Sequence, residues 1–149
     1  MGSPADTSHA NKIAEAARAL ALTVEVRVGS AHRTPEHVLQ LLRDYEADPR
    51  PKVYVTIAGR SNALSGFTDP QVSAPVIACP PPGDDVDIWS SVRMPPGVAC
   101  AYIAEPVNAA LFAAKVLAVH DKAVALAIAD ERARQRARVI TADRQVHGG

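Results

Sequence analysis

The sequence predicts an α/β protein with a parallel sheet that is covered by helices on both faces. Short apolar, β-branched segments alternate along the chain with longer segments whose apolar residues recur at helical spacing. Continuously apolar strands are typical of parallel sheets, because both faces of such a sheet are buried. The length of 149 residues suits one domain, so we expect a single domain over residues 1–149, with its core in residues 2–119.

Helices are expected at residues 8–20, 35–47, 107–119 and 121–142. The first is Ala-rich with a polar cap before it, and the second begins at Pro35, a residue suited to a first turn. Its apolar face is formed by Val38, Leu41, Leu42 and Tyr45. The segment DIWSSVRM is expected to add a short helix, and the arginines of the last helix spread around a solvated surface.

Strands are expected at residues 23–28, 52–58, 75–79 and 98–104. The first two, TVEVRV and KVYVTIA, are rich in β-branched residues, and PVIAC is short and apolar. The segments that follow these strands are rich in small or polar residues: GSAHRTP, GRSNALSG, PPPGDDVD and EPVN. Right-handed crossovers bring such loops to one rim of the sheet, where α/β proteins bind ligands. The opening GSPAD has the same character, so we expect a pocket at this rim.

Composition and motifs exclude several classes of function. Acidic and basic residues are equal at 16 each, which gives no reason to expect a nucleic-acid or membrane surface. No apolar run reaches the roughly 20 residues of a membrane span, and we expect a cytoplasmic protein. Walker and GxGxxG motifs are absent. His32 and His37 lack metal-ligand spacing, and we expect Cys79 and Cys100 to be reduced and buried, so no metal is predicted.

A single phosphate still suits the rim, because Ser3 and Ser30 supply hydroxyls and Arg33 supplies a guanidinium fork. With these loops in view, the sequence resembles the aminoimidazole ribonucleotide carboxylase family. GSPAD resembles the family's GSxSD loop, and GSAHRTPEH resembles its SAH(R/K)xP loop. IAGRSNAL followed by PVIACPP, and then DIWSSVRMPPGVAC, matches the class that uses carbon dioxide directly. The four motifs occur in the family's order, and the resemblance runs from residue 2 to about residue 119.

The resemblance implies a flavodoxin-like three-layer fold and a homo-octamer whose active sites lie where subunits meet. It implies reversible carboxylation of 5-aminoimidazole ribonucleotide by carbon dioxide, at ring carbon 4, in de novo purine biosynthesis. No cofactor is implied, and the partners are the ribonucleotide, carbon dioxide and copies of the chain. The expected product is 4-carboxy-5-aminoimidazole ribonucleotide.

The family's functional residues map onto matching positions. Four residues are expected to hold the ribose phosphate: Ser3, Asp6, Ser30 and Arg33. Of these, the Asp6 carboxylate is expected to bind the ribose hydroxyls. Those expected to shape the carbon dioxide and imidazole end are Gly59, Arg60, Ser61 and Asn62. His32 is the expected catalytic residue, because an imidazole with an ordinary pKa near 6.5 transfers protons in both directions at neutral pH. The remaining histidines are expected at the surface: His9, His37, His120 and His147. Trp89 is interpreted as a packing or interface residue.

The sequence departs from the family in three places. Ala5 replaces a serine of the phosphate loop, and the loop after Cys79 is shorter than usual. The family's first strand, which precedes GSxSD, has no counterpart before Met1. A flavodoxin-like sheet without that central strand has unpaired main-chain groups on the flanking strands, each costing about 1–3 kcal/mol when buried. We therefore expect the natural protein to begin upstream, with Met1 as an internal methionine.

Two alternative functions remain open. The related mutase moves a carboxyl group from the substrate's own nitrogen, but AGRSN differs from the glycine-rich, His-containing loop of that class. A degenerate, non-catalytic nucleotide-binding paralogue is compatible with Ala5 and the missing strand. The intact SAHR and AGRSN motifs argue against it, and a carboxylation or decarboxylation assay distinguishes all three.

Overall fold

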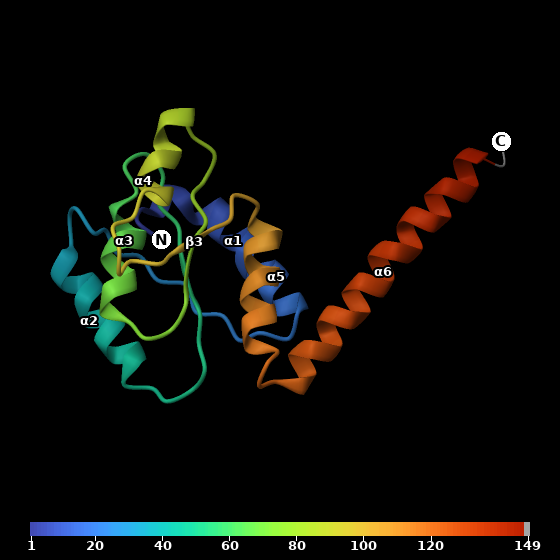
Figure 1. Ribbon diagram of the computed structural model, residues 1–149, viewed down its shortest axis with the longest axis horizontal. Helices are drawn as coiled ribbons and strands as arrows, with labels where there is room; N and C mark the ends of the chain where they lie inside the picture. Colours follow the sequence, from blue (N-terminus) through green and yellow to red (C-terminus); the bar gives the residue numbers. More distant parts are fainter. Residues whose placement is uncertain (148–149) are drawn as a thin grey trace.

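The computed structural model describes residues 1–147 and confirms the α/β architecture (Figure 1). Its strands are β1 (Tyr54–Thr56), β2 (Val76–Ala78) and β3 (Ala101–Tyr102). They form a parallel sheet in the order β1-β2-β3, in which Val55 pairs with Ile77 and Ile77 with Ala101. The confirmed strands are the three expected in residues 52–104, each shorter than the pattern suggests.

Helices cover both faces of this sheet and make three layers (Figure 1). On one face lie α1 (Thr7–Ala19) and α5 (Pro106–Leu117), which pack on each other through alanines and Ile13. On the other face lie α2 (Pro35–Glu46) and α3 (Ala63–Thr68), with Val38, Leu42 and Leu64 in one cluster. Side chains along β1 and the residue after it point alternately to the two faces of the sheet. Val55 and Ile57 therefore pack in the cluster with α1 and α5, and Tyr54 packs in the cluster with α2 and α3.

The shorter elements connect these layers. The 3₁₀ turns are η1 (Pro4–Asp6), η2 (Asp69–Gln71) and η3 (Asp85–Ile88). DIWSSVRM contains α4 (Trp89–Val92), which confirms the short helix expected there. Helix α3 was not expected, because its six residues are too few to show helical periodicity in the sequence.

The predicted strand at residues 23–28 is wrong, because this segment has no strand in the structure. Its β-branched pattern favours extended backbone, but a strand also needs a neighbour for its main-chain hydrogen bonds. Here only Arg27 is hydrogen-bonded through its main chain: its carbonyl accepts from the amino group of Met1 at 2.7 Å, among the residues described. The segment has the residue types of a strand, but within residues 1–147 no strand pairs with it.

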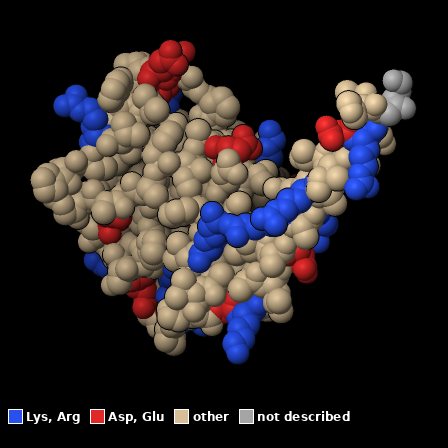
Figure 2. Space-filling view, turned by 45° about the vertical axis from the view of Figure 1, so that its right-hand side comes forward, with Lys and Arg blue, Asp and Glu red and all other residues tan. Residues whose placement is uncertain are grey.

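The last helix, α6 (Lys122–His147), runs five residues beyond the expected end at residue 142 and projects from the body as an arm (Figure 1). Only its first turns pack on the core, through Val124 and Ile128. Figure 2 shows lysines and arginines spaced along the arm, whereas the body beside it has few charges on the same face. Apolar side chains also lie exposed on it, with Val139 71% and Val146 85% exposed. No helix within residues 1–147 has the length and apolar character to cross a membrane.

Candidate functional site

Three of the polar loops meet at the carboxyl edge of the sheet. The Gly29 N–H donates to the Met1 carbonyl at 2.9 Å, and the Gly2 N–H donates to the Ile57 carbonyl at 2.8 Å. These bonds tie together the loop of residues 2–6, the loop of residues 29–34 and the start of the loop of residues 59–62. The loop after β2 also lies against these loops. Its Pro81 is so close to Gly59 that a Cβ atom on Gly59 would lie 3.3 Å from the Pro81 side chain. The expected clustering of the loops is therefore present.

The loop of residues 29–34 is organised by its own polar groups. The Ser30 hydroxyl accepts from the Arg33 N–H at 3.3 Å, and the Thr34 hydroxyl accepts from the Ser30 N–H at 3.0 Å. Pro35 then begins α2. The side chains of His32 and Arg33 are exposed and have no hydrogen-bond partner among residues 1–147. The loop thus presents an imidazole and a guanidinium, both free to meet a ligand, on a fixed turn.

The loop of residues 59–62 is held far more tightly. Arg60 has a positive φ of 54°, a conformation that costs a non-glycine residue about 1–2 kcal/mol. The Ser90 hydroxyl of α4 spans the loop, lying 3.0 Å from the Arg60 carbonyl and accepting from the Asn62 N–H at 2.8 Å. Arg60 and Ser61 are exposed, whereas Asn62 is 2% exposed.

Asn62 caps α3 and is occupied by internal hydrogen bonds. Its carbonyl oxygen accepts from the Ser65 N–H at 3.2 Å, and its amide donates to the hydroxyls of Ser65 and Ser91 at 2.7 and 3.0 Å. The serines of this network are not among the site residues predicted from the sequence. The signal for Ser65 was the spacing of an N-cap residue and the N3 position that it bonds, but nothing local pointed to Ser90 or Ser91.

The opening loop places Ser3 and Asp6 beside the start of a helix. Ser3 caps η1, where its hydroxyl accepts from the Ala5 N–H at 3.2 Å, and Asp6 immediately precedes α1. Both are partly exposed. The N–H groups of Ala5, Asp6 and Thr7 already donate to the Ser3 hydroxyl, the Ser3 carbonyl and the Pro4 carbonyl. An anion at this end of the site would therefore meet the Ser3 hydroxyl and the positive end of the α1 dipole. Ala5 supplies no hydroxyl there.

One histidine and one cysteine differ from expectation. His9 was predicted at the surface but is 9% exposed, and its Nε2 lies 3.5 Å from the Cys79 sulfur at the end of β2. The prediction was wrong because His9 falls on the inward face of α1, next to Ala10 and Ile13. Cys79 is buried as expected, but Cys100 is only half-buried. Both are free thiols, and burial raises the pKa of each to about 11.

These thiols are therefore protonated near neutral pH and are not nucleophiles. Burial lowers the pKa of His9, while its contact with Cys79 acts in the opposite direction. The neutral imidazole is thus the stable form in the fold, and His9 serves the packing of α1 against β2.

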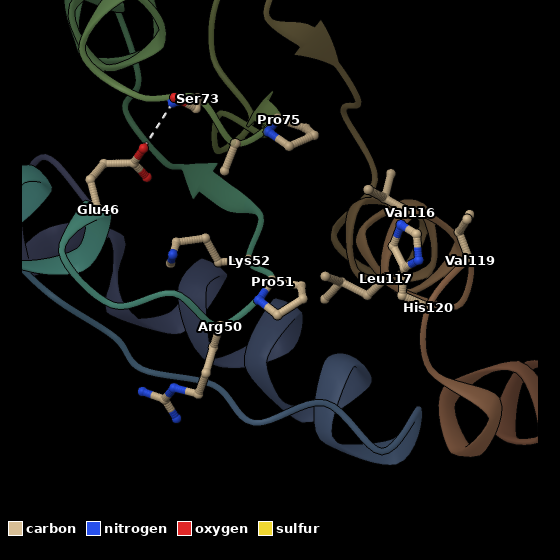
Figure 3. Close-up of a pocket in the computed structure, with 11 residues that line it drawn as sticks. Glu46, Arg50, Pro51, Lys52, Ser73, Pro75, Val116, Leu117, Val119 and His120 are labelled. Atoms are coloured by element: carbon tan, nitrogen blue, oxygen red, sulfur yellow. Dashed lines mark hydrogen bonds between the residues drawn. The ribbon is translucent and has the colours of Figure 1, made fainter.

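A hollow with a volume of about 410 Å³ lies at the opposite edge of the sheet (Figure 3). Its lining comes from the segments that precede β1 and β2 and from the end of α5, including Lys52, Pro75 and Leu117. Glu46 closes one side by accepting from the Ser73 N–H at 2.9 Å. None of the predicted site residues lines it, so the candidate site remains the loop cluster at the carboxyl edge.

The parallel sheet and its two helical layers define a flavodoxin-like α/β protein, and the loop cluster is a candidate ligand site at the carboxyl edge of its sheet. The sequence matches the AIR carboxylase family over residues 1–138, and the chain belongs to this family. The resemblance inferred from the four motifs is thereby confirmed.

Individual relatives agree with this assignment. A phosphoribosylaminoimidazole carboxylase of Treponema denticola is 52% identical over 128 residues, which cover 84% of this chain and 80% of that protein. One of Archaeoglobus fulgidus is 42% identical over 149 residues, covering 98% of this chain and 82% of that protein. The crystal structure of Treponema denticola PurE matches with a TM-score of 0.94 at 47% identity, covering 97% of this chain and 94% of that one.

Proposed function

We propose that this chain is a carboxy-lyase of purine biosynthesis that reversibly carboxylates 5-aminoimidazole ribonucleotide with carbon dioxide. The main support is that the loops that carry the family's motifs meet in space at one edge of the sheet. The named relatives, phosphoribosylaminoimidazole carboxylases at 42–52% identity, support the same reaction.

In this proposal the ribose phosphate binds between the opening loop and the loop of residues 29–34. Ser3, Ser30 and Arg33 offer two hydroxyls and a guanidinium, and the positive end of the α1 dipole lies beside them. Asp6 accepts hydrogen bonds from the ribose hydroxyls. A phosphate dianion would be held by charge-assisted hydrogen bonds, which contribute about 1.5–3 kcal/mol each.

His32 transfers the proton. The amino group of the substrate makes its imidazole an enamine, so ring carbon 4 attacks the carbon of carbon dioxide and forms the new C–C bond. The same ring carbon then loses its proton to the neutral imidazole of His32, and the ring regains its aromaticity. In the reverse direction protonated His32 returns this proton, and carbon dioxide leaves. Its free, exposed side chain suits this role.

The loop of residues 59–62 forms the carbon dioxide end. Gly59 lets the loop after β2 approach closely, and Arg60 and Ser61 are exposed toward solvent. The developing carboxylate is stabilised by these polar groups, which need no reorganisation because the loop is already fixed. The buried amide of Asn62 contributes by holding that loop in place.

The enzyme is further proposed to act as a homo-octamer in the cytoplasm, with carbon dioxide as the carboxyl donor. Apolar side chains that one chain leaves exposed support assembly with further copies, among them Trp89 at 58% and Val139 at 71%. The free thiols of Cys79 and Cys100 are typical of a reducing compartment. Light scattering of the purified protein measures the oligomeric state, and monomers at micromolar concentration would contradict the assembly.

The test is an assay of purified protein with aminoimidazole ribonucleotide and bicarbonate, without ATP. We expect product to form, and to form faster when carbonic anhydrase replenishes dissolved carbon dioxide. Activity restricted to the N-carboxylated substrate would instead identify a mutase. Substrate binding without turnover in either assay would identify a non-catalytic paralogue.

A further inference from the structure

One hydroxyl of α4 holds both ends of the turn formed by residues 60–62. The Ser90 hydroxyl accepts from the Asn62 N–H at 2.8 Å and donates toward the Arg60 carbonyl at 3.0 Å. It also lies 2.7 Å from the Asp87 carbonyl, on the segment that leads into α4. A serine hydroxyl has one proton and two lone pairs, so these contacts use its proton and one lone pair. The contacts of Ser90 are thus internal to the protein.

The conformation of this turn depends on the Ser90 hydroxyl. Arg60 has a φ of 54°, in the left-handed region that is unfavourable for a residue with a Cβ atom. Within residues 1–147, neither the Arg60 carbonyl nor the Asn62 N–H has another hydrogen-bond partner. Without Ser90, both groups would bond to water and Arg60 could relax to an ordinary φ. The strained conformation therefore persists because a distant residue fixes the turn at both ends.

Helix α4 is itself held firmly against the fold. The Ser91 side chain is 1% exposed and accepts from the Asn62 amide at 3.0 Å. The residues that follow α4 pack closely on α3, because a Cβ atom on Gly66 would lie 3.1 Å from the Met94 sulfur. Ser90 is therefore supported from behind, as a residue that positions a neighbouring loop has to be.

The turn decides where two exposed side chains point. The side chains of Arg60 and Ser61 are exposed and make no hydrogen bond within the part of the chain that the structure describes. Their directions are therefore set by the main chain that carries them. A left-handed φ directs a side chain differently from an extended or right-handed φ. The Ser90 hydroxyl thus determines where the guanidinium of Arg60 and the hydroxyl of Ser61 are presented.

We propose that Ser90 is a positioning residue for the carboxylation, because its hydroxyl keeps the turn in the conformation that presents Arg60 and Ser61 to the forming carboxylate. This inference rests on the proposed function, in which these side chains form the carbon dioxide end of the site. Polar groups stabilise a developing charge best when they are already in place. Misplacing such groups by about 1 Å can cost about 100-fold in rate. Loss of the Ser90 hydroxyl should therefore slow the reaction, although Ser90 does not contact the substrate.

The test compares Ser90→Ala with two further variants in the decarboxylation direction, where carbon dioxide need not be supplied. Ser90→Ala should lower kcat about 10-fold or more, while KM for the ribonucleotide stays nearly constant because other loops hold its phosphate. Ser90→Thr keeps the hydroxyl and should keep most of the kcat. The matched control is Thr56→Val, which removes a buried hydroxyl bonded to Ser65. It should lower the melting temperature and leave kcat nearly constant.

Hydrogen exchange of the Asn62 amide, followed by NMR, tests the turn independently of activity. This N–H donates to the Ser90 hydroxyl, so its exchange should become about 10-fold faster or more in Ser90→Ala and stay slow in Ser90→Thr. If the amide responds in this way but the unaltered chain turns over no substrate, the proposed function is wrong, whereas Ser90 still fixes the turn.

Four results would overturn the proposal. The first is a kcat in Ser90→Ala equal to that of the unaltered chain. The second is an Asn62 amide that exchanges as slowly in Ser90→Ala as in the unaltered chain, since other contacts would then hold the turn. The third is a Ser90→Thr variant with slow exchange but the low kcat of Ser90→Ala. The fourth is an equal fall of kcat in Thr56→Val, which would trace the effect to lost stability.

Discussion

The two loops that carry the candidate chemistry are held in different ways. The loop of residues 59–62 follows the paired strand β1 and is fixed by Ser90, Ser91 and the capping amide of Asn62. The loop of residues 29–34 follows the unpaired segment 23–28 and is joined to the sheet through Met1. We call them the paired-side loop and the open-side loop.

Because of this difference, we expect the paired-side loop to contribute mainly to stability and the open-side loop mainly to catalysis and binding. In the paired-side loop the Asn62 side chain makes internal hydrogen bonds, so substitution of Asn62 should first lower the stability of the fold. The open-side loop leaves its imidazole and guanidinium exposed, so its substitution should be felt first in turnover and binding. Substitutions in the two loops should therefore differ in whether they change turnover, binding or stability.

The largest effect is expected for His32→Asn in the open-side loop. Asparagine keeps a polar side chain but cannot titrate, so the maximal rate should fall about 100-fold or more, because proton transfer typically contributes about 10²–10⁴. The melting temperature should not change, since His32 is exposed and without partners within residues 1–147. Steady-state kinetics and calorimetry measure the two quantities. Full turnover of the variant would show that His32 does not transfer the proton. A loss of folding would show that the open-side loop also contributes to stability.

The next effect is expected for Asn62→Ala in the paired-side loop. This change removes a helix cap and leaves the Ser65 and Ser91 hydroxyls short of a partner, which should lower the free energy of unfolding by about 2 kcal/mol. The exposed neighbour Ser61 provides the control, because Ser61→Ala should change the free energy of unfolding by less than about 0.5 kcal/mol. Urea denaturation measures both. Equal effects of the two substitutions would show that the capping network is not what fixes the loop.

Arg33→Ala should weaken substrate binding without slowing the chemical step. A phosphate clamp acts in the ground state and the transition state alike, so KM should rise about 10-fold or more while kcat stays nearly constant. Arg43→Ala, which removes an exposed arginine of α2 away from the site, is the matched control. A fall in kcat at unchanged KM would mean that Arg33 takes part in the chemistry.

The smallest effect concerns the pH dependence of stability through His9. Burial lowers the pKa of His9 below its ordinary value of 6.5 in the folded chain. As the pH falls below 6.5, the unfolded chain takes up a proton before the folded chain does, so the free energy of unfolding should decrease toward the folded pKa. Urea denaturation at pH 7.5 and 5.5 should show a smaller decrease for His9→Gln than for the unaltered chain. The exposed His37→Gln should leave the decrease unchanged, and an identical response in both variants would refute the burial effect.

Much of the fold followed from local pattern. The spacing of Val38 and Leu42 after Pro35 predicted α2, and the short apolar run around Ile77 predicted β2, because both depend on which face of a segment is buried. The loop cluster followed as well, since parallel strands place their carboxyl ends at one edge. The burial of His9 did not follow, because it depends on how α1 meets β2.

Local sequence patterns thus predicted the layers, the family and the residues of the candidate site. Contacts between distant segments set which strand-forming segment becomes a strand and which polar side chain holds a loop in place. Residues 23–28 and 52–58 have similar propensity, yet a strand exists only where a neighbour completes its hydrogen bonds. Asn62 and Arg60 share one motif, but contacts with Ser90 and Ser91, about 30 residues away, bury the first and leave the second exposed. Hydrogen bonds between distant segments carry no signature in either segment alone.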